Sequence, residues 1–156
     1  MVPNLTVMLN EQRDVYLKEK GMVKGDKRKK FSDVDTVANF LNECFDAKYQ
    51  ASENVWLLAL DTRLHLIAVF EIASGGANTC IVDPNVIFRS ALMTGATGII
   101  VAHNHPTGIT NPSGQDDEVT ERLIKGGQIL SCPLVDHIII GADAYSYRSN
   151  KGYMFS

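Results

Sequence analysis

A short run without a polar face, GIIVA at residues 98–102, places the tightest limit on the fold. A second run, LVDHIII at residues 134–140, is nearly as apolar. Strands that are apolar on both faces occur where helices cover both sides of a sheet. The two runs therefore predict buried strands at the centre of a layered α/β domain, a mixed central sheet flanked by helices.

The rest of the chain alternates between helical and strand-like patterns. Apolar residues recur at helical spacing after Ser32 and Asp33, either of which is a suitable N-cap. Two apolar runs split by residues 61–63 favour a hairpin, and Asp83 followed by Pro84 is typical of a helix start. The predicted helices cover residues 31–46, 84–94 and 113–126, and the predicted strands cover residues 55–60, 64–72, 79–82, 98–102, 134–140 and 144–148.

Length and composition describe one ordinary globular domain. The 156 residues are 45% hydrophobic and 21% charged, and no apolar run approaches the roughly 20 residues that a membrane span needs. The beginning of the sequence lacks the basic-then-apolar pattern of a secretion signal. Cys44, Cys80 and Cys132 form no CxxC pair, which argues against a disulfide scaffold or a cysteine zinc knuckle. These features predict a cytoplasmic protein that does not enter a membrane.

Charge is distributed unevenly along the chain. Residues 18–30, KEKGMVKGDKRKK, hold seven basic and two acidic residues, while the remainder of the chain holds eight basic and sixteen acidic ones. We therefore expect residues 1–30 to be an N-terminal extension with a basic arm and residues 31–156 to be the main domain. The arm between Lys18 and Lys30 has two interpretations, a solvated linker or a contact with the phosphate backbone of nucleic acid. No aromatic residue lies among these charges, which argues against base stacking.

The segment that follows the central apolar run carries the residues most suited to catalysis. His103 and His105 flank Asn104, and residues two apart in an extended chain point to the same side. The next residues are rich in turn formers, and Ser113 is a suitable N-cap that places Asp116 in the first turn of a helix. Two imidazoles and one carboxylate are a usual ligand set for catalytic Zn²⁺, with the fourth position left to water.

These residues also carry a family resemblance. The spacing His103-x-His105, seven residues, Ser113, two residues and Asp116 resembles the motif of the JAMM/MPN metallopeptidase superfamily. The blocks HNHPTG, NPSGQDD, TERL, VDHIIIG and AYSYRSNKGY are similar to those of its bacterial RadC-like members. The resemblance runs from about residue 34 to residue 152 and implies the JAMM/MPN architecture, which is cytidine-deaminase-like.

The sequence departs from the RadC-like pattern at several places. Thr107 replaces a serine, Asn85 stands where the family has an arginine, and Ser149 lies near a usual glutamate. The helix-hairpin-helix segment that precedes this domain in longer RadC proteins does not occur in this sequence, which weakens the DNA-repair role that the resemblance implies.

The resemblance also implies a role for each matched residue. His103, His105 and Asp116 would hold Zn²⁺, and Ser113 would donate a hydrogen bond to the oxyanion. A glutamate before the first core strand would move the proton of the attacking water. Glu53 lies 50 residues before His103 and Glu71 lies 32 residues before it. The separation in the superfamily is nearer the larger value, so Glu53 is the favoured general base and Glu71 the alternative.

Three other polar residues near the motif have weaker claims to the site. His137 lies within an apolar run, where a histidine is usually a hydrogen-bonded core residue, and Asn104 is expected to fix the loop. Asp117 is a possible competitor of Asp116 for the metal, and the spacing from Ser113 favours Asp116.

Two function classes follow from these observations. The first is a zinc-dependent metallohydrolase that cleaves a peptide or isopeptide bond in a protein or peptide substrate with a metal-activated water. The alternative is a DNA-associated RadC-like repair or processing module without catalysis, which would contact nucleic acid through the Lys18–Lys30 arm. Zinc deaminases are excluded because no glutamate stands two residues after either histidine, and Cys132-Pro133 reverses their Pro-Cys order.

Overall fold

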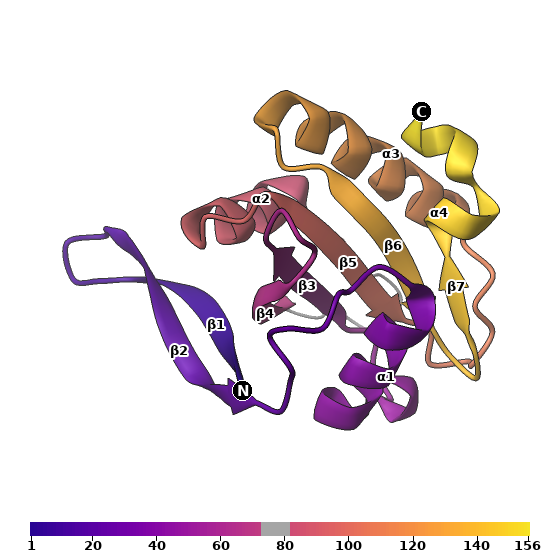
Figure 1. Cartoon of the computed structure of the whole chain (residues 1–156), viewed down its shortest axis with the longest axis horizontal. Helices are drawn as coiled ribbons and strands as arrows, with labels where there is room; N and C mark the ends of the chain where they lie inside the picture. The colour runs from indigo at the N-terminus through magenta and orange to yellow at the C-terminus, as the bar shows by residue number, and fades with distance from the viewer. Residues whose placement is uncertain (73–81) are drawn as a thin grey trace.

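The computed structural model describes residues 1–72 and 82–156, which form one seven-stranded sheet with helices on both of its faces (Figure 1). The strand order is β2-β1-β4-β3-β5-β6-β7. The strands are β1 Val2–Leu9, β2 Val15–Val23, β3 Val55–Leu60, β4 Leu66–Ile72, β5 Gly98–Asn104, β6 Leu134–Ile140 and β7 Ala144–Ser146. The predicted strand at residues 79–82 and Cys80 fall largely or wholly outside the described residues.

Helices enclose the sheet from two sides, which confirms the predicted α/β class. Helix α1 (Val34–Phe45) packs on one face, where Trp56, Leu58 and other even-numbered positions of β3 join its core. Helices α2 (Pro84–Met93) and α3 (Gly114–Leu130) pack on the other face, where Leu57 and Ala59 point. Because successive side chains of a strand point to opposite faces, one apolar strand contributes to both cores.

The central position of the 98–102 run is confirmed. Strand β5 is buried at every residue, pairs antiparallel with β3 and pairs parallel with β6. The strand continues to Asn104, so the prediction that a loop begins at His103 was wrong by two residues. The difference arises from pairing, because His103 lies in register with Val55 on one side and Ile139 on the other.

The helix starts follow the predicted capping residues. The side chain of Asp33 accepts a hydrogen bond from the backbone of Thr36, and Asp83 caps α2 ahead of Pro84. Helix α3 continues past the predicted end at residue 126 to Leu130. The helix passes through Gly127, where a Cβ would lie 2.7 Å from the carbonyl oxygen of Cys132. Glycine is used here for close packing of the helix on the chain that enters β6.

The N-terminal residues form structure that the charge pattern did not predict. β1 and β2 form a hairpin, and β1 joins the main sheet through parallel pairing of Asn4 with Val69 and Leu5 with Phe70. The interpretation of residues 18–30 as a linker is therefore wrong for residues 18–23, which lie in β2. In Figure 1 the far end of this hairpin projects away from the body of the molecule.

At the C-terminus the predicted edge strand is shorter than expected. β7 ends at Ser146, and residues 147 and 148 belong to α4 (Tyr147–Asn150). The hydroxyl of Ser146 accepts a hydrogen bond from the backbone N–H of Ser149 and so caps this short helix. Short 3-10 helices follow α1 at Ala47–Tyr49 and end the chain at Gly152–Phe155. None of the helices in the described parts of the chain is both long and apolar enough to cross a membrane.

Candidate metal centre

The two histidines of the HxH motif converge at the end of β5. His103 is the penultimate residue of the strand and is only 2% exposed, and His105 follows the strand. Their Nε2 atoms lie 3.1 Å apart. The Nδ1 atom of His105 lies 2.8 Å from the carbonyl oxygen of Ile109. Because a carbonyl only accepts, the neutral ring of His105 carries its one proton on Nδ1, which leaves Nε2 as the nitrogen available to a metal ion.

Asp116 approaches both imidazoles from the first turn of α3. One carboxylate oxygen lies 3.2 Å from Nε2 of His103, and the other lies 3.3 Å from Nε2 of His105. A reciprocal cap holds the carboxylate, since Oδ2 accepts from the backbone N–H of Ser113 at 2.9 Å. In return the hydroxyl oxygen of Ser113 accepts from the backbone N–H of Asp116 at 3.1 Å. The hydroxyl proton of Ser113 is not used by this cap and can be donated to another group.

The spacing of these donor atoms matches what a tetrahedral metal ion requires. Zinc binds nitrogen and oxygen ligands at about 2.0–2.2 Å, so two ligands of a tetrahedron are separated by about 3.3 Å. His103, His105 and Asp116 present donor atoms 3.1–3.3 Å apart. The donor set and its spacing therefore fit such an ion, and the structure brings the three predicted ligands together.

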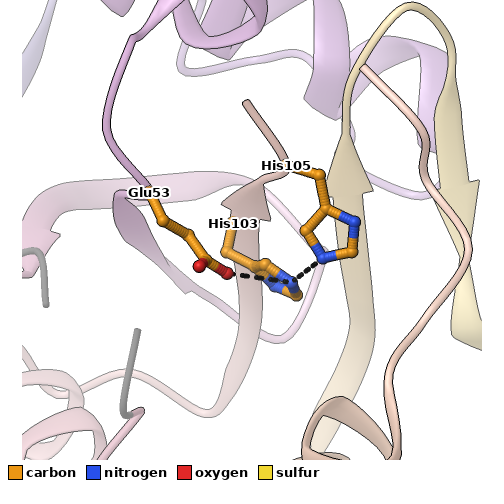
Figure 2. A group of neighbouring side chains, drawn as sticks. All are labelled: Glu53, His103 and His105. Atoms are coloured by element: carbon orange, nitrogen blue, oxygen red, sulfur yellow. Dashed lines mark hydrogen bonds and ion pairs between the residues drawn. The ribbon is translucent and has the colours of Figure 1, made fainter. Parts of the chain in front are cut away.

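Glu53 lies just before β3 and approaches the same nitrogen of His103 as Asp116 does. Its Oε1 is 3.9 Å from Nε2 of His103, and Figure 2 shows its carboxylate and the ring of His105 both directed at the His103 ring. Glu53, His103 and His105 each offer an atom within 4.8 Å of the others, a group able to hold a metal ion. Glu71 contacts other residues. Its carboxylate accepts a hydrogen bond from Asn4 at 2.8 Å and forms an ion pair with Lys20 at 3.5 Å.

Asn104 fixes the segment that carries Glu53. Its side chain is 1% exposed, and its Oδ1 accepts a hydrogen bond from the backbone N–H of Asn54 at 2.6 Å. Its Nδ2 donates to the carbonyl of Ser52 at 3.0 Å. The residue between the two histidines therefore holds the chain on both sides of Glu53.

Charges of both signs meet at the site and shift the pKa values of its groups. Burial acts to raise the pKa of Asp116, but hydrogen bonds that the doubly protonated rings of His103 and His105 donate from Nε2 outweigh it and hold that pKa well below its usual range. The hydrogen bond that His105, when protonated on both nitrogens, donates to Asp116 raises the pKa of His105. Burial lowers the pKa of His137 well below its ordinary value. At neutral pH Asp116 is therefore ionised and His137 is neutral.

The structure adds contacts behind the histidines that the sequence did not reveal. His137 is fully buried in β6, and its Nε2 lies 2.8 Å from Nδ1 of His103. Its Nδ1 lies 2.6 Å from the hydroxyl of Thr120, a residue that sequence reasoning missed. The available signal was spacing, since Thr120 lies one helical turn after Asp116 on the same face of α3. Asp117, the possible competitor of Asp116, accepts hydrogen bonds from Tyr147 at 2.8 Å and from Lys151 at 2.9 Å. Its carboxylate therefore contacts these two residues and not the histidines.

The sequence is similar to a known family over most of its length. Residues 31–153 match the family described as the RadC-like JAB domain. A UPF0758 protein of Alkaliphilus oremlandii is 41% identical over 118 residues, which is 75% of this chain and 50% of that protein. UPF0758 proteins of Caldanaerobacter subterraneus subsp. tengcongensis and Thermotoga maritima are 38% and 36% identical over 119 and 116 residues. These alignments cover 76% and 74% of this chain, and 50% and 52% of the two relatives.

The chain spans about half the length of the curated relatives that it matches. The matched region contains the histidines, the capped aspartate and the glutamate of the candidate metal centre, and it lies within the α/β fold described above. The resemblance that the motif spacing indicated is thus confirmed, and the chain belongs to the RadC-like JAB domain family.

Proposed function

We propose that the chain is a zinc-dependent hydrolase that cleaves a peptide or isopeptide bond. The observation that carries the proposal is the arrangement of His103, His105 and Asp116, whose donor atoms lie 3.1–3.3 Å apart with Glu53 and Ser113 beside them. Two imidazoles and one carboxylate leave a fourth position open, which is typical of catalytic rather than structural zinc sites.

When bound, zinc would lower the pKa of a coordinated water toward neutrality and polarise the carbonyl of the substrate. Glu53 would accept the proton of the attacking water and return it to the leaving amine, since its carboxylate faces the two histidines. The free hydroxyl proton of Ser113 would stabilise the negative charge that develops on the substrate oxygen. Asn104 would keep Glu53 in place through its bonds to the chain on either side.

Metal content and hydrolysis together test the proposal. The 156-residue chain is dialysed against chelator-buffered zinc and analysed for metal. It is then incubated with a library of peptides and isopeptide-linked peptides, and the products are identified by mass spectrometry. We expect one zinc per wild-type chain, none in His105→Ala, and cleavage only by the wild type. His65→Ala is the matched control, because His65 contacts Asp61 at the β3–β4 turn and not the site. Equal zinc content in wild type and His105→Ala, or cleavage that persists in that variant, would refute the proposal.

A nucleic-acid contact is a second candidate, favoured by one observation. The seven basic side chains between Lys18 and Lys30 are all exposed, on β2 and on the segment that links it to α1. Within the described residues, only two of them form ion pairs, Lys20 with Glu71 and Arg28 with Asp26. Exposed and largely unpaired cations are suited to displacing counterions from a phosphate backbone.

A further inference from the structure

A line of buried polar contacts leads from the first turn of α3 to the ring of His103. The hydroxyl of Thr120 lies 2.7 Å from the backbone carbonyl oxygen of Asp116 and 2.6 Å from Nδ1 of His137. On the other side of its ring, His137 places Nε2 at 2.8 Å from Nδ1 of His103. Thr120 and His137 are both fully buried.

The number of protons available fixes which group donates and which accepts at each contact of this line. The carbonyl of Asp116 can only accept, so its contact with Thr120 uses the single hydroxyl proton of Thr120. Nδ1 of His137 must then carry the proton of its own contact with Thr120. A neutral imidazole has one N–H, so Nε2 of His137 is an acceptor and Nδ1 of His103 donates to it. In the neutral ring of His103 the single proton is thereby held on Nδ1, and the unprotonated nitrogen is Nε2, which lies 3.2 Å from the Asp116 carboxylate.

Packing holds the middle ring of this line in one plane. The ring of Tyr147 stacks on His137 with a centroid separation of 5.0 Å and an interplanar angle of 9°. Tyr147 is itself fixed, because its hydroxyl donates to Asp117 at 2.8 Å and Asp117 pairs with Lys151. His137 is thus held by a hydrogen bond at each nitrogen and by an aromatic ring on one face.

We propose that Thr120 and His137 are positioning residues that select the tautomer of His103, keeping its Nε2 free of a proton and ready to bind a metal ion. This inference rests on the metal site of the proposed function and adds to it two residues that contact neither the metal nor the substrate. His105 needs no such pair, because the carbonyl of Ile109 selects the same tautomer directly. Partners behind a metal-binding histidine that fix its tautomer change metal affinity by about 10–100-fold when removed.

Removing the Thr120 hydroxyl should reverse the tautomer that His103 prefers. In Thr120→Val the Nδ1–H of His137 would be buried without an acceptor, which is costly. His137 would move its proton to Nε2 and donate to Nδ1 of His103, whose own proton would then reside on Nε2. Zinc could bind only after that proton was displaced. Thr120→Ser keeps a hydroxyl at the same place and is the matched control.

The experiment first determines the tautomer of His103 in the metal-free protein and then measures the affinity of the protein for zinc. Long-range ¹H–¹⁵N spectra of the metal-free 156-residue chain at about pH 8.5, roughly two units above the ordinary imidazole pKa, distinguish protonated from unprotonated ring nitrogens. We expect protonated Nδ1 and unprotonated Nε2 for His103 in the wild type and in Thr120→Ser, and loss or reversal of this pattern in Thr120→Val. Zinc affinity, measured by competition with a chelator, should fall by about 10–100-fold in Thr120→Val and be restored in Thr120→Ser.

The inference is overturned if His103 carries its proton on Nε2 in the wild type, a result that needs no variant to fold. It is also overturned if a folded Thr120→Val keeps the wild-type tautomer and zinc affinity. Failure of the chain to hydrolyse any peptide would count against the proposed function and leave the tautomer result standing.

Discussion

Ser113 and Asp116 hold each other through two reciprocal hydrogen bonds across the first turn of α3. The backbone N–H of Asp116 donates to the Ser113 hydroxyl at 3.1 Å, and the backbone N–H of Ser113 donates to the Asp116 carboxylate at 2.9 Å. The same carboxylate faces His103 and His105. A capping box therefore starts the helix and also orients the carboxylate that is the candidate metal ligand.

Replacing Ser113 tests separately its role as a helix cap and the proposed role of its hydroxyl in catalysis. Ser113→Ala should lower the free energy of unfolding by about 1 kcal/mol through loss of the cap. It should also reduce kcat by about 10²–10³-fold if the hydroxyl stabilises the oxyanion. Stability is measured by chemical denaturation and kcat on the best peptide found in the cleavage library.

Ser113→Gly is the control for the cap. Glycine at an N-cap costs only a few tenths of a kcal/mol relative to serine, so this variant should keep most of the stability and lose kcat to the same extent. An alanine variant with wild-type kcat would show that the hydroxyl serves the helix alone.

The position of Glu53 predicts a selective loss of catalysis. Glu53→Gln keeps the shape of the side chain and removes its ability to accept a proton. We expect zinc content to stay at one per chain and kcat to fall by about 10²–10⁴-fold. Glu71→Gln is the matched control, because it makes the same chemical change at a glutamate that contacts Asn4 and Lys20 and not the histidines. It should leave kcat unchanged. The assignment of the base would be reversed if Glu71→Gln lost activity and Glu53→Gln kept it.

The sequence predicted best the parts of the site that are close together along the chain. The two histidines are two residues apart on one strand, and Ser113 and Asp116 share one helical turn, so periodicity alone places each pair. Glu53 reaches the site through long-range register, with Val55 opposite His103 across the β3–β5 pair. Spacing along the chain does not encode that register, so only the family resemblance favoured Glu53 over Glu71.

Long-range contacts also explain why the sequence did not predict the pairing of Thr120 with His137 or the N-terminal hairpin. Thr120 and His137 lie 17 residues apart and meet because α3 packs against β6. The charge pattern of residues 18–30 does not predict the N-terminal hairpin, although Leu5, Val7 and Leu17 of that hairpin pack against the core. Its parallel pairing with β4 joins segments more than 60 residues apart, which no local pattern predicts.

Exposure of the basic segment predicts salt-dependent binding to DNA. The variant Lys27→Gln/Lys29→Gln/Lys30→Gln should bind a duplex more weakly than the wild type. Its plot of log K against log salt concentration should lose about 0.9 of slope for each phosphate contact removed. Lys48→Gln/Lys125→Gln, which removes two positive charges outside the segment, is the control, and the effects are compared per charge removed. Binding that responds equally to both variants, or that ignores salt, would exclude a contact through this segment.

The Asp33 cap of α1 predicts a contribution to the free energy of unfolding that depends on pH. A hydrogen bond from the backbone of Thr36, aided by the Thr36 hydroxyl, lowers the pKa of Asp33 below its ordinary value. A carboxyl group with a lowered pKa in the folded state stabilises the fold above its unfolded pKa, about 4, and this stabilisation is lost as pH falls through the folded pKa. Asp33→Ala should therefore cost about 1 kcal/mol near neutral pH and progressively less in acid.

Asp33→Asn tests whether the charge or only the cap is responsible. Asparagine caps as well as aspartate but does not titrate, so its stability relative to Asp33→Ala should not vary between neutral and acidic pH. Denaturation midpoints of the three proteins across this range provide the measurement. A difference between wild type and Asp33→Ala that stayed constant into strong acid would contradict the assignment.

The close packing of α3 against the chain that enters β6 predicts that alanine is tolerated less well at Gly127 than at Gly114. A Cβ on Gly127 would lie 2.7 Å from the carbonyl oxygen of Cys132 and 3.0 Å from Cα of Pro133, both backbone atoms that cannot rotate away. Alanine favours a helix over glycine by about 1 kcal/mol, but forced separation of packed elements costs about 1–3 kcal/mol. Gly127→Ala should therefore be neutral to destabilising by up to about 2 kcal/mol. Gly114→Ala, where no atom lies within 4 Å of the added Cβ, should be neutral or stabilising. Urea denaturation of both variants measures the difference, and a Gly127→Ala protein more stable than Gly114→Ala would mean that α3 does not approach the entry to β6 this closely.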